Sequence, residues 1–262
     1  MPPTRSLVLR ALLLVTLLAL ACLLCGFGPP LLTDSDHSPT LRIRPTVADP
    51  VSFNRDVDAV TAPSALVYDW NATRTLFARA ADTPRAPASL TKLMTALLAL
   101  DAGSLDQSVT VQGIDLIGDA SMGLQAGEVV TLEQLLWGLL LPSGNDAAMT
   151  IARAVGGDPE AFVALMNERA VALNLTATHF ESPHGLDRAG QTSSARDLLR
   201  IALLDWNQPL FRAIVGTAGA EVAGHPLKNT NELLGPLAGN ENTSVIGVKT
   251  GTTDQAGQCL VA

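Results

Sequence analysis

The stretch "PASLTKLMTALLAL", Pro87 to Leu100, decides how the chain is organised. Its apolar residues recur with the spacing of one helix face, and alanines occupy much of the opposite face. A helix that is apolar nearly all round is buried on every side. The sequence therefore predicts a central helix whose apolar face carries Leu90, Leu93, Met94, Leu97 and Leu98.

Two polar residues stand at the start of this helix, and their placement indicates chemistry. Pro87 favours a helix start, which leaves Ser89 in the first turn, where free N–H groups and the helix dipole favour developing negative charge. Lys92 follows three residues later and shares a face with the hydroxyl. Apolar surroundings lower the pKa of a lysine toward the range in which it accepts protons. Together they form a candidate nucleophile with its base.

Alone, the S-x-x-K spacing is a weak signal, because about one should occur by chance in a chain of this length. Ser89 could simply cap the helix while Lys92 extends to water. Two further motifs strengthen the interpretation. Ser143-Gly144-Asn145 lies in a turn between two predicted helices, and Lys249-Thr250-Gly251 lies on a predicted strand, at spacings of 54 and 106 residues. Ser143 and Asn145 taken singly would fit ordinary turn chemistry, which does not explain the joint order.

The rest of the chain predicts an α+β fold. Two runs of strand-forming residues, 64–70 and 74–80, are separated like a hairpin, and β-branched alternation returns after Gly239. Helix-start signals lie between them, at Thr131–Gln134, Asp158–Pro159 and Ser194–Asp197. We therefore expect an antiparallel sheet that takes strands from both ends of the domain, flanked by an inserted, mostly helical region.

The N-terminus has the features of an export signal. Arg5 and Arg10 precede an uncharged apolar run, Ala11 to Phe27. The predicted divisions are a signal peptide or membrane anchor at 1–28, a proline-rich and charged linker at 29–62, and a catalytic domain at 63–262. Both a cleaved signal and a retained anchor remain open. Only Cys259 lies beyond the leader, so we expect no disulfide within the domain.

Composition excludes several classes of function. The net charge is −8 and the isoelectric point about 4.9, with no basic cluster beyond the leader, which argues against nucleic acid or an anionic membrane surface as partner. No G-x-S-x-G motif is present, and Val248 before Lys249 does not fit a phosphate-binding loop. His179 and His184 make a poor metal pair, so we predict neither a metal nor a cofactor. The stretch "SPHGLD" is interpreted as a structural loop, with His184 a satisfied polar group.

The ordered set S-x-x-K, S-x-N, K-T-G is typical of the serine penicillin-binding proteins and their β-lactamase relatives. With "GLQAGEVVTLEQLLWGLLLPSGNDAAMTIA" and "FESPHGLD", the chain from about Ala65 onward resembles the low-molecular-weight D-alanyl-D-alanine carboxypeptidases, over roughly three-quarters of its length. The resemblance implies the DD-peptidase/β-lactamase-like fold and the bacterial cell envelope as location. It also implies peptidoglycan stem peptides ending in D-Ala-D-Ala as substrate and β-lactams as covalent inhibitors.

The resemblance assigns the catalytic roles residue by residue. Ser89 would attack the carbonyl between the two D-alanines, and Lys92 would take its proton. Ser143 would pass the proton to the leaving amine, while Asn145 holds Lys92 and the substrate amide.

The strand motif would bind the substrate. Lys249 supplies a cation that helps to keep the neighbouring lysine neutral. Thr250 and Thr252, on either side of Gly251, offer hydroxyls to the terminal carboxylate. The backbone N–H groups of Ser89 and Thr252 would form the oxyanion hole.

Two alternatives remain open. A β-lactamase of class A would need a deacylating glutamate in an E-x-x-L-N pattern, which is absent after the S-x-N turn, where Glu168 and Glu181 do not match. A penicillin-sensing domain without catalysis would keep Ser89 and Lys92. In the family a further strand and a closing helix follow the K-T-G strand, so we also expect that the domain is incomplete at its C-terminus.

Overall fold

The computed structural model describes residues 60–237 and 240–262. The predicted leader, 1–28, lies outside these residues, as does the predicted linker, 29–62, apart from its last three positions. Within the described ranges, no helix combines the length and apolarity needed to cross a membrane. The same ranges hold no group of three or more His, Cys, Asp or Glu side chains suited to a metal ion.

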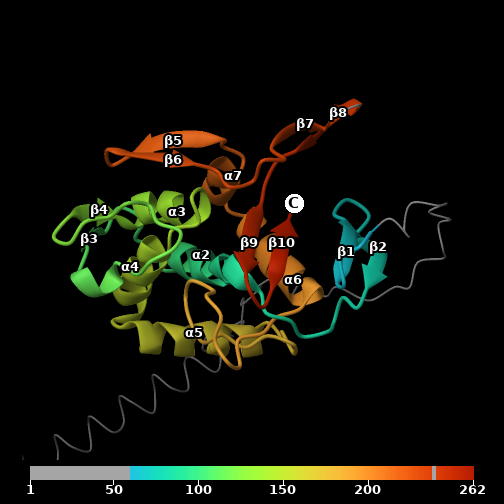
Figure 1. The fold of residues 1–262 in the computed structure, drawn as a ribbon, viewed down its shortest axis with the longest axis horizontal. Coiled ribbons are helices and arrows are strands. Elements are labelled where there is room, and N and C mark those ends of the chain that lie inside the picture. Colours follow the sequence, from blue (N-terminus) through green and yellow to red (C-terminus); the bar gives the residue numbers. More distant parts are fainter. Residues whose placement is uncertain (1–59, 238–239) are drawn as a thin grey trace, which may run out of the picture. The chain divides into compact units, whose positions relative to one another are not determined.

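The predicted central helix is α2, Lys92–Asp101, which follows a short 3₁₀ helix, Ala88–Thr91. Figure 1 shows α2 among the other helices, and four of them contact it. Leu93, Met94, Ala96 and Ala99 are fully buried, which confirms the predicted central position. The contacting helices are α3 (Leu132–Leu140), α4 (Asn145–Gly156), α5 (Pro159–Ala172) and α6 (Ala195–Trp206), and α7 (Pro209–Val215) packs on α3 and α6.

The predicted helix starts are confirmed by their capping hydrogen bonds. Thr131 and Gln134 form a capping box at the start of α3, each side chain bonded to the other residue's backbone N–H. The Asp158 side chain accepts from Ala161 N, with Pro159 as the first residue of α5. The Ser194 hydroxyl accepts from Asp197 N at the start of α6. These bonds satisfy donors that a helix N-terminus otherwise leaves free.

The strands form antiparallel pairs, and the α+β class is confirmed. Each pair joins two strands that are consecutive along the chain. The pairs are β1 (Ala65–Asp69) with β2 (Arg74–Arg79), β3 (Ser108–Thr110) with β4 (Val129–Thr131), β5 (Gly219–Val222) with β6 (His225–Lys228), β7 (Gly235–Leu237) with β8 (Asn240–Val245), and β9 (Lys249–Thr253) with β10 (Gly257–Val261).

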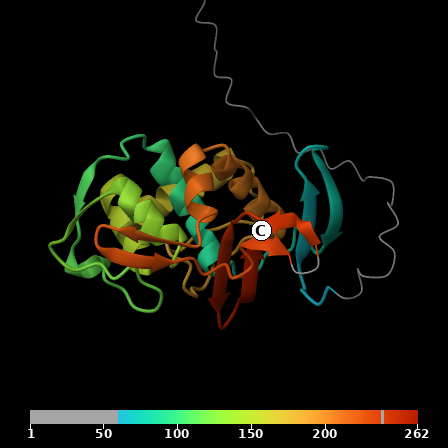
Figure 2. The same ribbon diagram turned by 90° about the horizontal axis from the view of Figure 1, so that it is seen from above.

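One detail of the predicted sheet is corrected. Among the described residues, β1–β2 and β9–β10 are separate two-stranded sheets and are not hydrogen-bonded to each other. Figure 2 shows them as two hairpins. Residues of β1 and of β10 both line a groove of about 520 Å³, together with Leu198 of α6. The strands from both ends of the domain are neighbours without forming one continuous sheet.

Asp205, near the end of α6, is a buried carboxyl group whose two oxygens have no hydrogen-bond partner among the described residues. Burial, aided by the charge of Asp101, raises its pKa well above the ordinary value. A raised acid pKa stabilises the fold below the unfolded-state pKa, and this stabilisation is lost as the pH rises. Asp205 therefore disfavours folding at neutral and alkaline pH.

We expect Asp205→Asn to raise the free energy of unfolding at pH 8 by about 2 kcal/mol, because the amide cannot ionise in the core. Near pH 4 the advantage should shrink, since the carboxyl is then protonated in the folded state and about half protonated in the unfolded state. Thermal unfolding at the two pH values measures the difference, with the exposed Asp106→Asn as matched control. An equal effect at both pH values would mean that packing, and not ionisation, is responsible.

Candidate active site

Ser89 lies in the 3₁₀ helix that leads into α2, with its side chain half-buried. Two glycines from distant parts of the chain pack against this turn. A Cβ atom at Gly251 of β9 would lie 2.9 Å from Ser89 N, and one at Gly185 would lie 2.0 Å from the Ala88 carbonyl oxygen. Ala88 itself has a φ of +49°, in the left-handed region. Two glycine contacts thus hold the backbone around Ser89, and Ala88 within it has a φ value that residues other than glycine rarely adopt.

Lys92 is fully buried, and its amine has three close polar partners. Nζ lies 3.0 Å from Ser89 Oγ, 2.7 Å from Asn145 Oδ1 and 2.8 Å from the His184 carbonyl oxygen. Burial, and next the charge of Lys249, lower the pKa of Lys92 well below its ordinary value, while Asp146 acts in the opposite direction. The structure therefore favours a neutral amine at this position.

The partners of Lys92 decide where its lone pair points. An amide oxygen and a carbonyl oxygen can only accept hydrogen bonds, so the two N–H bonds of a neutral amine are directed to Asn145 and His184. The lone pair is left for the third partner, the Ser89 hydroxyl. This arrangement can remove a proton from Ser89 Oγ without any rearrangement of the lysine.

The Ser143-Gly144-Asn145 turn connects α3 to α4, as the sequence indicates. Ser143 is buried in a left-handed conformation, with φ of +63°, and its Oγ atom has no hydrogen-bond partner among the described residues. Asn145 is the first residue of α4, and besides accepting from Lys92 it donates from Nδ2 to the Gly118 carbonyl at 2.9 Å. Among the described residues, the Ser143 hydroxyl is therefore available to another partner, whereas the Asn145 amide is hydrogen-bonded through both its oxygen and its nitrogen.

Strand β9 carries Lys249, Thr250, Gly251 and Thr252. Lys249 is buried and donates from Nζ to the Thr250 carbonyl at 2.8 Å, and burial lowers its pKa to about 7. An anion bound beside it would favour the charged form. Thr252 is exposed. The close approach of Gly251 to Ser89 N brings the Lys249 amine and the hydroxyls of Thr250 and Thr252 to the turn that carries Ser89.

Two contributors to the site have no signal in the sequence motifs. The "SPHGLD" loop supplies the His184 carbonyl to Lys92, and its Pro183 carbonyl accepts from Thr95 Oγ1 at 2.6 Å. His184 fits the predicted satisfied polar group, since its Nδ1 accepts from Leu186 N and burial lowers its pKa to about 3. A backbone acceptor leaves no residue signature, although the glycine after His184 is a hint of close packing.

Thr230, in the segment between β6 and β7, is the second contributor that the motifs do not reveal. Its Oγ1 lies 2.6 Å from Thr250 Oγ1, and its backbone N–H donates to the Leu141 carbonyl, two residues before Ser143. It links the turn to β9 and adds a hydroxyl beside Thr250. Ordinary loop composition around Thr230 gives no means of finding it.

The model of the peptidase S11 family, described as D-alanyl-D-alanine carboxypeptidase, matches residues 51–262. The chain belongs to this family. It is 38% identical over 220 residues to the D-alanyl-D-alanine carboxypeptidase DacA of Escherichia coli K12, covering 79% of this chain and 53% of that protein. It is also 37% identical over 210 residues to the D-alanyl-D-alanine carboxypeptidase of Streptomyces sp. K15, covering 71% and 70%. The chain thus spans about half the length of the first of these family members.

Solved structures of the family share the fold. The S96A mutant of the Streptomyces K15 DD-transpeptidase superposes with a TM-score of 0.68 at 33% identity, covering 76% of this chain and 84% of that one. A D-alanyl-D-alanine carboxypeptidase from Mycobacterium tuberculosis H37Rv gives 0.67 at 34% identity, covering 75% of each chain. The fold predicted from the motif order is therefore the fold of this family.

Proposed function

We propose that this chain is a serine-type D-alanyl-D-alanine carboxypeptidase that removes the terminal D-alanine from peptidoglycan stem peptides through an acyl-enzyme on Ser89. The observation that carries the proposal is the buried Lys92 amine, whose two acceptor-only partners leave its lone pair to the Ser89 hydroxyl. Membership of the carboxypeptidase family supports the same reaction.

In the proposed acylation step, Lys92 takes the proton of Ser89 as Oγ bonds to the carbonyl carbon of the penultimate D-alanine. The negative charge moves to the carbonyl oxygen, where the N–H groups of Ser89 and Thr252 stabilise it. The C–N bond then breaks, and the leaving amine receives the proton from Lys92 through the Ser143 hydroxyl. Ser143 Oγ has no hydrogen-bond partner among the described residues, which supports this role, because a proton carrier needs an exchangeable partner.

Deacylation repeats these steps with water. Lys92 takes a proton from the attacking water, the ester bond to Ser89 Oγ breaks, and the proton returns to Oγ. The terminal carboxylate of the substrate would lie against Thr250 and Thr252, beside the Lys249 cation. The position of Gly251 supports this placement, since a side chain there would collide with the Ser89 turn.

Release of D-alanine from a synthetic peptide ending in D-Ala-D-Ala tests the proposal, with a peptide ending in D-Ala-L-Ala as substrate control. We expect Ser89→Ala to lower kcat by at least about 10⁴-fold, because the nucleophile is lost while the fold is kept. Intact mass after treatment with benzylpenicillin should show one adduct in the wild type and none in the variant. An adduct without D-alanine release would favour a penicillin-sensing domain, and rapid turnover of nitrocefin would favour a β-lactamase.

We also propose that the protein is exported to the bacterial cell envelope, either released after signal cleavage or held by an N-terminal anchor. The charged start followed by the apolar run Ala11–Phe27 supports export. Peptidoglycan stem peptides and β-lactams are the proposed partners at that location. Fractionation of cells that express the full chain, followed by intact-mass measurement, would distinguish a cleaved from a retained N-terminus.

A further inference from the structure

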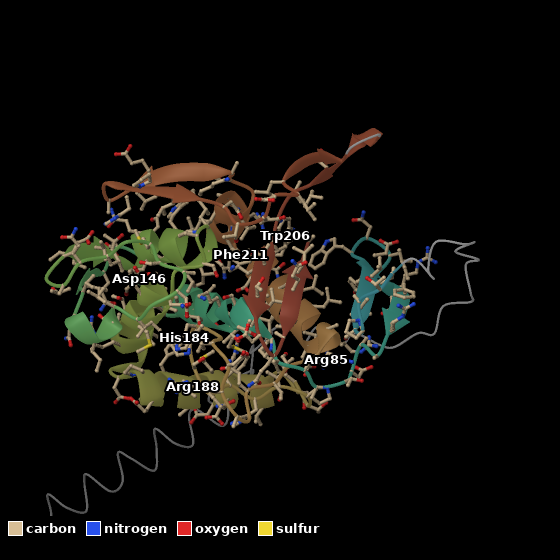
Figure 3. The ribbon with its side chains drawn as sticks, in the orientation of Figure 1. Arg85, Asp146, His184, Arg188, Trp206 and Phe211 are labelled. Carbon is tan, nitrogen blue, oxygen red and sulfur yellow. The ribbon has the colours of Figure 1, made fainter. Side chains whose placement is uncertain are left out.

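Asp146, the residue after the S-x-N turn, has an unusual set of partners for a carboxylate on a helix. It is 1% exposed and lies in the first turn of α4 (Figure 3). Its two oxygens accept hydrogen bonds from five donors of the described residues. Four of these donors lie on a segment more than twenty residues earlier in the chain, and one lies on its own helix. These are Ser121 Oγ at 2.6 Å, Met122 N at 2.9 and 3.1 Å, Gly123 N at 3.1 Å, Leu124 N at 3.1 Å and Ala147 N at 2.8 Å.

The segment that Asp146 binds is residues 118–124, which we call the wall loop. Asn145 binds the same loop, because its backbone N–H donates to the Ala120 carbonyl at 2.7 Å and its Nδ2 to the Gly118 carbonyl. The loop therefore depends on two consecutive residues for its position. One of them, Asn145, is also an acceptor for the Lys92 amine.

The wall loop packs closely against the turn at two glycines. A Cβ atom at Gly144 would lie 2.7 Å from Asp146 Oδ1 and 2.9 Å from Met122 N. The Met122 side chain in turn fills the space beside Gly138 of α3, where a Cβ would lie 2.1 Å from its sulfur. A change in the position of Asp146 is therefore transmitted to the turn that carries Ser143 and Asn145.

We propose that Asp146 is a positioning residue for acyl transfer, which holds the wall loop against the Ser143-Gly144-Asn145 turn and thereby fixes the Asn145 amide that orients Lys92. This inference rests on the proposed function, since it assigns Asp146 a part in the same reaction. Five accepted hydrogen bonds on one buried carboxylate exceed what a helix cap requires, because a cap satisfies one or two N–H groups. The extra donors all belong to the wall loop.

The charge of Asp146 gives this role a signature that a purely structural anchor lacks. Two charged groups on separate elements shift the pKa of Lys92, namely Lys249 of β9 and Asp146 of α4. A third titratable residue, His184 of the "SPHGLD" loop, lies beside it. Burial keeps His184 neutral near pH 7, so its ring adds no charge. Lys249 lowers the pKa of Lys92 and Asp146 raises it. Because Lys92 must be neutral to act as base, acylation rises with pH through the pKa of Lys92, and removal of the negative charge moves that rise to lower pH.

The experiment compares Asp146→Asn with Asp115→Asn, a control that disturbs another buried carboxylate bound to α4. Asp115 is fully buried and forms a salt bridge with Arg153, which lies on α4 as Asp146 does. The distance between Asp115 Oδ2 and Arg153 Nη2 is 2.6 Å. The readout is the second-order rate constant for acylation by benzylpenicillin, followed by intact mass from pH 5 to pH 9. A third variant, Ser121→Ala, removes one wall-loop donor and keeps the charge.

For Asp146→Asn we expect an acylation rate constant roughly 10 to 100-fold below wild type at its optimum, because a misplaced base loses alignment with the nucleophile. We also expect the rise of the pH profile at lower pH than in the wild type. Asp115→Asn should lower thermal stability but leave the position of that rise unchanged. Ser121→Ala should slow acylation by a smaller factor without moving the profile, and it keeps the test decisive if Asp146→Asn fails to fold.

Outcomes that overturn the inference differ from those that overturn the proposed function. A wild-type protein that benzylpenicillin does not acylate contradicts both. If the wild type is acylated, and Asp146→Asn or Ser121→Ala is acylated at the wild-type rate with the wild-type pH profile, only the role of Asp146 is contradicted. The same pH shift in Asp115→Asn would likewise assign the effect to helix α4 as a whole.

Discussion

Replacement of Lys92 by arginine is expected to lower the rate of Ser89 acylation by benzylpenicillin by at least about 10³-fold. A guanidinium keeps its proton at any pH at which the protein is folded, so it cannot take one from Ser89. It is also bulkier and would place a fixed charge in a fully buried position near Lys249. Time-resolved intact mass gives the rate directly.

Two further variants separate the loss of the base from damage to the fold. Lys92→Met keeps a long unbranched side chain and removes the amine, so it should be equally slow without a buried charge. Lys228→Arg changes an exposed lysine of β6 and should behave as wild type. Circular dichroism establishes that each variant is folded. Acylation of Lys92→Arg at the wild-type rate would reduce Lys92 to a packing role.

Replacement of Gly185 by alanine should lower the free energy of unfolding by about 3 kcal/mol or more, which combines overpacking with an unfavourable backbone conformation. The new Cβ would lie 2.0 Å from the Ala88 oxygen and 2.6 Å from the Ala88 carbonyl carbon, and Gly185 has a φ of +92°. Neither atom is at the end of a flexible side chain, so the backbone must move. Because Ala88 precedes Ser89, the proposed nucleophile, we expect acylation to fall as well.

Gly157→Ala is the matched control for this effect. Gly157 follows α4 with a φ of +88°, and a Cβ there would have no heavy atom of the described residues within 4 Å. It therefore isolates the conformational cost of about 1 kcal/mol from the steric one. Chemical denaturation of both variants gives the comparison. If Gly185→Ala were no more destabilising than Gly157→Ala, the contact with Ala88 would not constrain the nucleophile turn.

Local signals account for the parts of the fold that the sequence predicts. The side-chain spacing around Leu93 and Leu97 indicates a helix buried on all sides, and the caps at Thr131 and Asp158 mark helix starts, because each depends on residues within one or two turns. The same holds for Ser89 and Lys92, whose side chains meet because they are three positions apart. The order of the motifs S-x-x-K, S-x-N and K-T-G along the chain then indicates the family.

Contacts made by backbone groups or across long stretches of chain were not predictable in this way. The His184 carbonyl would bind Lys92 whatever side chain residue 184 carried, so no residue type reports it. Asp146 could be taken as an ordinary acidic residue at a helix start until the wall loop is seen to bind it. The separation of β1 from β10 likewise depends on tertiary packing, which strand periodicity does not encode.

The sequence distances around Lys92 have a consequence for newly made chains. The three partners of its amine belong to residues that lie 3, 53 and 92 positions from Lys92 along the chain. In an unfolded chain the amine is hydrated and charged, with a pKa near 10.4, and the serine is an ordinary alcohol. On the proposed mechanism, reactivity toward β-lactams is therefore acquired only when distant segments have assembled, and nascent or misfolded molecules carry no reactive hydroxyl. Labelling with a fluorescent penicillin would for this reason count natively folded molecules in a mixture, where an antibody or a stain counts every chain.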